Sequence, residues 1–133
     1  AHAATFQGIV ALDHILGRPT AVDLNLVPSA VFTYPELATV GQTEQECKDA
    51  GLEYSVQKCY YRQNGKAVSM GEGDGYAKFL WSADDTLLGA HIMGAHASDL
   101  IHEATILMRT GAKHSLLKNT IHAHPTLSEI ILQ

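Results

Sequence analysis

The 133-residue sequence has few cysteines and no long apolar run. Its two cysteines, Cys47 and Cys59, have eleven residues between them, which is the spacing of neither a C-x-x-C nor a C-x4-C redox pair, so two reduced thiols are expected. No apolar stretch approaches the roughly 18–20 residues of a transmembrane helix, and no signal-peptide pattern is present. We therefore expect no disulfide, no membrane partner and a reducing compartment.

The sequence also lacks a dinucleotide-binding fingerprint and an excess of positive charge. It contains no G-x-G-x-x-G, the glycine pattern that approaches a pyrophosphate. The net charge of −5 argues against nucleic acid as a partner. The glycine-rich run 71–75 carries only two acidic residues without EF-hand spacing, so a flexible turn is expected there rather than a calcium loop.

What is present describes a globular chain with its own core. Hydrophobic residues make up 46% and charged residues 17% of the sequence, and the length suits one domain. The first residue is Ala1 rather than Met, and the chain starts inside a helical pattern. We therefore expect a piece of a longer protein.

The order of predicted elements indicates an α+β fold. A helix is expected over 2–16, ended by Gly17, and a linker over 20–28. Four strands are predicted over 30–33, 52–61, 75–82 and 86–93, the last two joined as a hairpin, with Asn64-Gly65 as a turn. Helices are predicted over 43–50, where Thr43 and Glu46 have the capping-box pattern, over 98–110 with Ser98 as its cap, and over 115–121. Short connections with helices gathered at the end favour α+β over βαβ winding.

The stretch 122–129 holds the residues with the most chemistry. His122 and His124 are candidates for acid–base work, and Pro125 disfavours helical geometry at His124. Spacing alone leaves three interpretations open. Thr126 and Glu129 have the T-x-x-E pattern of a helix cap, His124 and Glu129 suit an acid–base pair, and the two histidines with Glu129 resemble metal ligands.

The run His-Ala-His-Pro-Thr-Leu-Ser-Glu, together with residues 27–41 and the strand 87–94, resembles the FAD-dependent pyridine nucleotide–disulfide oxidoreductases. Within them it is most similar to the dihydrolipoamide dehydrogenases. The resemblance covers roughly residues 27–133. It implies a C-terminal interface domain with a mainly antiparallel sheet and helices on one side, and residues 1–26 as the tail of a preceding FAD domain. It also implies that His124 and Glu129 are the acid–base pair.

The same resemblance implies cofactors and partners for the full-length protein. FAD and NAD are expected there, with His124, Ala1 and His2 close to the flavin, but no cofactor, no metal and no activity are expected for this chain by itself. A homodimer is expected, with the helix 98–110 and the segment after Pro125 facing the partner. His124 then takes a proton from dihydrolipoamide, carried by the lipoyl domain of a 2-oxo acid dehydrogenase complex, beside the partner's redox-active disulfide. The implied location is the cytoplasm, or the mitochondrial matrix in a eukaryote.

Three alternatives remain from the sequence. The chain is the dimerisation domain of a related flavin disulfide reductase, a non-catalytic dimerisation or binding module, or a metal-binding protein using His122, His124 and Glu129.

Overall fold

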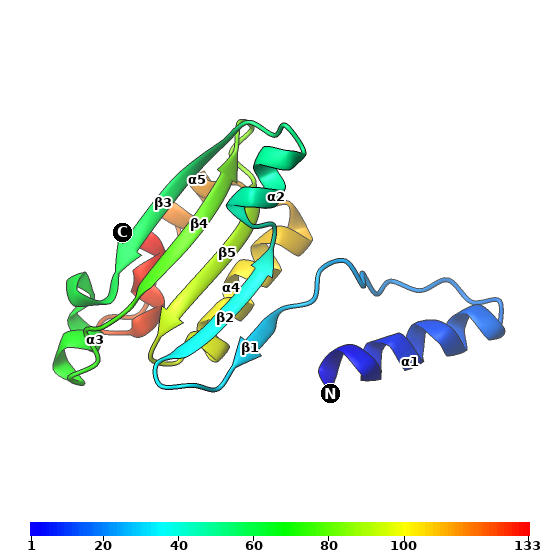
Figure 1. The fold of residues 1–133 in the computed structure, drawn as a ribbon, viewed down its shortest axis with the longest axis horizontal. Coiled ribbons are helices and arrows are strands. Elements are labelled where there is room, and N and C mark those ends of the chain that lie inside the picture. Colours follow the sequence, from blue (N-terminus) through cyan, green and yellow to red (C-terminus); the bar gives the residue numbers. More distant parts are fainter.

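The computed structural model describes all 133 residues and contains a five-stranded, wholly antiparallel sheet in the order β1-β2-β5-β4-β3 (Figure 1). The strands are β1 (Ser29–Val31), β2 (Glu36–Gly41), β3 (Tyr54–Tyr60), β4 (Tyr76–Ser82) and β5 (Leu87–Gly94). The predicted α+β class with a mainly antiparallel sheet is confirmed.

The expected strand count was one too low, at the start of the sheet. A single strand was predicted over 30–33, but the chain turns around Thr33 and Pro35, and both arms are strands that pair with each other. Proline has no N–H and a fixed φ, so one strand does not continue through it. The second arm, β2, lies beside β5 with Leu37 opposite Met93.

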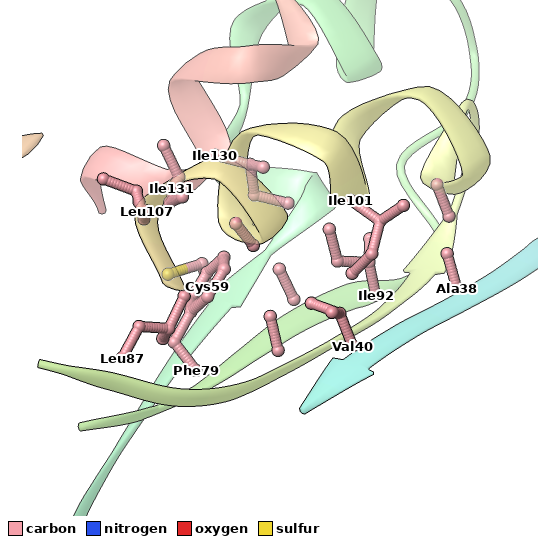
Figure 2. Close-up of a cluster of buried hydrophobic side chains, with 14 of the residues drawn as sticks. Ala38, Val40, Cys59, Phe79, Leu87, Ile92, Ile101, Leu107, Ile130 and Ile131 are labelled. Carbon is pink, nitrogen blue, oxygen red and sulfur yellow. The ribbon is translucent and has the colours of Figure 1, made fainter. Parts of the chain in front are cut away.

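The main core lies between one face of the sheet and the C-terminal helices. These are α4 (Ala97–Thr110), α5 (His114–Lys118) and a 3-10 helix, η2 (Leu127–Leu132). Figure 2 shows the packed cluster, to which the sheet contributes Ala38, Val40, Cys59, Phe79, Leu87 and Ile92 and the helices contribute Ile101, Leu107, Ile130 and Ile131. Burial of such side chains is the largest favourable contribution to folding. In Figure 1 these helices lie behind the sheet, and only α2 (Glu44–Asp49) lies in front.

Two predicted helix caps had different outcomes. The Thr43–Glu46 capping box of α2 is formed: the Thr43 N–H donates to Glu46 Oε2 (2.8 Å) and the Glu46 N–H to Thr43 Oγ1 (3.2 Å). Ser98 was expected to cap the next helix, and this is wrong. Helix α4 starts earlier, after His96, and the Ser98 N–H donates to the carboxylate of Glu36 (2.9 Å).

The predicted turn at Asn64-Gly65 is also different in the structure. Asn64 follows a short 3-10 helix, η1 (Tyr61–Gln63), and is the N-cap of α3 (Gly65–Ser69), where its Oδ1 accepts the Ala67 N–H at 3.0 Å. Asparagine is a strong capping residue as well as a turn former, so the local pattern fits both structures. The helix predicted over 115–121 is shorter and covers only α5.

Helix α1 (His2–Ile15) lies to one side of the sheet and contributes nothing to the core (Figure 1). It has no buried residue, although it carries large apolar side chains such as Phe6, Ile9 and Leu12. Gly17 follows it with a positive φ of 64°, the left-handed geometry that glycine adopts without strain. No helix in the structure has both the length and the apolar character needed to cross a bilayer.

Candidate functional site

Two structured elements position the candidate pair at the C-terminal corner of the domain. Residues 119–126 form an irregular segment between α5 and η2, and the His124–Pro125 peptide in it is cis. His124 Nδ1 lies 2.9 Å from Glu129 Oε1 and 3.2 Å from Oε2. The His124 side chain is 77% exposed, whereas that of Glu129 is 26% exposed. The ring is therefore held by a carboxylate on one edge and faces outward with the other.

Glu129 also binds the backbone at the start of η2. Its Oε2 accepts the Thr126 N–H at 2.8 Å. The Thr126 N–H and the His124 ring together lower the pKa of the Glu129 carboxyl below its ordinary value, because both stabilise the charged form. One carboxylate thus makes both the contact with the backbone at the start of η2 and the contact with His124.

The charge of Glu129 determines which nitrogen of His124 is free. An ionised carboxylate only accepts hydrogen bonds, so Nδ1 of His124 carries the hydrogen that it donates. In the neutral ring, Nε2 then holds an unshared electron pair and has no partner within this chain. Nε2 can therefore accept a proton from a group outside the domain, and the imidazolium so formed is stabilised by Glu129.

His122 is held by different partners from His124. Its Nε2 lies 2.7 Å from Glu103 Oε1 of α4, and its Nδ1 lies 3.1 Å from the Thr120 carbonyl oxygen. The side chain is only 8% exposed. Burial disfavours the charged ring, but the Glu103 carboxylate and the Thr120 carbonyl outweigh burial and raise the pKa of His122.

Two residues of this corner were not found from the sequence. Glu103 lies nineteen positions before His122, where no spacing rule connects them. Asn64 was assigned to a turn, but its Nδ2 donates to the Thr126 carbonyl oxygen at 3.0 Å while it caps α3. Asn64 is almost fully buried, and its hydrogen bond fixes the chain directly after Pro125.

The structure does not gather the three proposed metal ligands. His122 and His124 bind separate carboxylates, Glu103 and Glu129. Across the described residues 1–133, no group of three or more His, Cys, Asp or Glu side chains is placed to hold a metal ion. The corner thus holds two separate histidine–carboxylate pairs, whose histidines are two residues apart in the sequence.

Ala1 and His2, expected near the flavin, lie away from this corner. They line an open cleft of about 1030 Å³ between α1, the linker, β1 and α4, in which 12 of 21 lining residues are hydrophobic. His2 Nε2 is 2.8 Å from the carbonyl oxygen of Pro28. Within this chain the structure therefore brings His124 and Glu129 together, but not His124 with Ala1 or His2.

Sequence comparisons place this domain among known proteins. A family described as "Pyridine nucleotide-disulphide oxidoreductase, dimerisation domain" matches residues 27–133. A dihydrolipoyl dehydrogenase of Synechocystis is 46% identical over 98% of this chain, and one of Bacillus subtilis is 41% identical over all of it. The chain spans 29% and 28% of the length of these two relatives.

Comparison with solved structures agrees with the sequence match. LpdA from Mycobacterium tuberculosis has a TM-score of 0.86 and 25% identity, covering 96% of this chain and 28% of that protein. The HOCl-induced flavoprotein disulfide reductase RclA from Escherichia coli has a TM-score of 0.81 and 26% identity, covering 91% of this chain and 28% of RclA.

Proposed function

This chain belongs to the family of pyridine nucleotide-disulphide oxidoreductase dimerisation domains, and from that premise we propose that it is the dimerisation domain of a dihydrolipoyl dehydrogenase, with His124 and Glu129 as its acid–base pair. The observation that carries this proposal is the 2.9 Å contact between His124 and Glu129, with the outer edge of the His124 ring exposed. We further propose that residues 1–26 are the tail of a preceding FAD domain and residues 27–133 the dimerisation domain.

The proposed role of His124 is to take a proton from a thiol of dihydrolipoamide. Thiols react with disulfides as thiolates, and few thiolates exist near neutral pH without a base. His124 Nε2 accepts the proton, and the thiolate sulfur attacks the redox-active disulfide expected in the partner subunit. One sulfur–sulfur bond forms while the other breaks. Glu129 stabilises the resulting imidazolium and keeps the Nδ1 hydrogen in place.

The cofactors expected for the full-length protein are FAD and NAD. The residues of this chain fit a supporting role rather than a binding role, because the sequence has no dinucleotide fingerprint. Ala1 and His2 would meet the flavin from the apolar cleft beside α1, and the exposed ring of His124 would meet it from a second subunit. When bound, FAD would supply the acceptor for the electrons that pass from the dithiol through the disulfide, and NAD would take them onward.

A homodimer follows from the proposed role, since His124 has to reach a disulfide that this chain does not contain. Exposed apolar side chains on and beyond the C-terminal helices support such an interface. Ile121 is 98%, Ile106 62% and Leu116 59% exposed. These three side chains are available to such an interface. The substrate partner would be dihydrolipoamide on a lipoyl domain.

A second candidate is a related flavin disulfide reductase that acts on another disulfide, which the structural likeness to RclA favours. The two candidates share the corner chemistry and differ in the substrate. Comparing flavin reduction by dihydrolipoamide with reduction by NADH and NADPH in the full-length protein separates them.

Stopped-flow reduction of the flavin by dihydrolipoamide tests the proposal in the full-length protein. We expect His124→Ala to slow this half-reaction by about 10²–10⁴-fold, the usual contribution of a positioned general base, with flavin content unchanged. His14→Ala, an exposed histidine on α1, is the matched control and should keep the wild-type rate. Reduction of His124→Ala at the wild-type rate would overturn the acid–base role.

A further inference from the structure

Both ring nitrogens of His122 face groups that only accept hydrogen bonds. Nε2 meets the Glu103 carboxylate at 2.7 Å and Nδ1 meets the Thr120 carbonyl oxygen at 3.1 Å. A neutral imidazole carries a single N–H and satisfies one of these contacts, whereas an imidazolium satisfies both. Because the His122 side chain is only 8% exposed, the ring has little access to water that could replace a missing contact. The geometry thus matches the charged ring.

The contacts of His122 connect α4 to the segment that follows α5 and carries His124. Glu103 comes from the middle of α4, Thr120 follows α5, and His124 is two residues further on. The charged groups that face His122 are Glu103 of α4 and Glu129 of η2, and both carboxylates favour the imidazolium. Helix α4 itself is rigid here, because Ile101 and Ala104 on either side of Glu103 are fully buried in the core.

We propose that His122 and Glu103 are positioning residues for the His124–Glu129 pair: the charged His122–Glu103 pair fixes the segment 120–124 on α4, so that His124 is held in place while His122 is protonated. The inference rests on the proposed function, since it assigns a regulator to the same site. Deprotonation of His122 removes one of its two hydrogen bonds and loosens the segment. The effectiveness of His124 then depends on the protonation of a neighbour that never contacts the substrate.

The variant Glu103→Gln in the full-length protein tests this inference, because glutamine keeps the shape and one hydrogen bond but removes the charge. The measured quantity is the rate of flavin reduction by dihydrolipoamide in the variant, divided by the rate in wild type. We expect this ratio to be about one tenth near pH 6, which is the effect that the loss of one charge-assisted hydrogen bond would have. The ratio should approach one at high pH, where wild-type His122 has lost its proton as well. His122→Gln should show the same trend.

Glu44→Gln is the matched control. Glu44 of α2 also pairs with a cation within 3 Å, Lys78 Nζ at 2.9 Å, and its side chain is 34% exposed, as is that of Glu103. Glu44 lies on the opposite side of the sheet from the C-terminal helices. Removing its charge should therefore leave the ratio of variant to wild-type rate unchanged across the pH range. A flat ratio for both Glu103→Gln and His122→Gln, in protein with full flavin content, would show a purely structural pair and overturn the inference.

Hydrogen–deuterium exchange of the peptide spanning residues 119–126 provides a second readout that needs no turnover. We expect this peptide to exchange faster in Glu103→Gln than in wild type or Glu44→Gln. In wild type, we expect its exchange to rise with pH by more than the intrinsic pH dependence of amide exchange. Unchanged exchange in Glu103→Gln would show that the His122–Glu103 pair does not hold the segment 120–124 on α4. A wild-type rate of flavin reduction in His124→Ala would instead refute the proposed function. The exchange measurement would still test the His122–Glu103 pair in that case, so failure of this inference and failure of the proposed function are distinguishable.

Discussion

The two histidines of the His-Ala-His-Pro run differ in exposure and in the number of hydrogen-bond partners, although only one residue separates them. His124 pairs with Glu129, which is close in sequence, and its ring is 77% exposed. His122 pairs with Glu103 of α4, which is distant in sequence, and its ring is 8% exposed. His124 has one nitrogen free, while His122 has none. An exposed ring with a free nitrogen is able to exchange protons with a substrate, and a buried ring with two partners is able to hold the chain.

This contrast shows that a repeated residue type does not imply a shared role. The His124–Glu129 pair also contributes to the start of η2, because Glu129 accepts the Thr126 N–H there. The distant pair brings together elements that the chain visits at different times, α4 and the segment after α5. The His124–Glu129 pair is therefore a candidate for acid–base catalysis, and the His122–Glu103 pair is a candidate for holding the segment in place.

The largest expected difference between the two histidines is in stability. His122→Ala leaves the Glu103 carboxylate and the Thr120 carbonyl without their partner and should lower the free energy of unfolding by about 1–3 kcal/mol. His124→Ala removes an exposed side chain and should change it by less than about 0.5 kcal/mol. Urea denaturation of the two variants measures both values. Equal losses would remove the distinction drawn between the two pairs.

A smaller effect is expected from Glu129→Gln on flavin reduction in the full-length protein. Glutamine still accepts the Thr126 N–H and a hydrogen bond from His124, but it loses the charge that stabilises the imidazolium. We expect a loss of about tenfold, clearly less than for His124→Ala. Stopped-flow traces of both variants at one pH give the ranking. A loss in Glu129→Gln as large as that in His124→Ala would mean that charge, rather than the base itself, dominates the site.

The smallest expected effect is an opposite pH dependence of the stability that each pair contributes. The pKa of His122 is raised in the folded state, so its contribution is full below the ordinary value of 6.5 and is lost as the pH rises through the raised value. The pKa of Glu129 is lowered, so its contribution is full above the ordinary value of 4.5 and is lost as the pH falls through the lowered value. Both contributions are complete between those two ordinary values.

Urea midpoints measured from about pH 3 to pH 9 test this opposition. Compared with wild type, His122→Ala should lack part of the alkaline decline, and Glu129→Gln should lack part of the acid decline. If either variant changes the decline on the other side, the assignment of the titrating group is wrong.

Sequence patterns were sufficient wherever the interaction was local. The α+β class and the hairpin of β4 and β5 are present as predicted. So is the capping box at Thr43, because its partners lie three residues apart and their geometry is set within one helical turn. The contact between His124 and Glu129, which the family resemblance implied and spacing alone left open, is also present. Local errors arose where one pattern fits two structures, as at Asn64-Gly65 and at the strand interrupted by Pro35.

The sequence by itself determined which functional groups are available at the corner: two imidazoles, a proline and a carboxylate within eight residues. Only the tertiary structure decided which imidazole is buried, because burial depends on where α4 packs against the sheet. It also supplied Glu103 and Asn64, whose partners lie 19 and 62 residues away. Contacts over such separations arise from the packing of α4, α3 and the sheet into one core, and no periodicity or spacing within a short window encodes them.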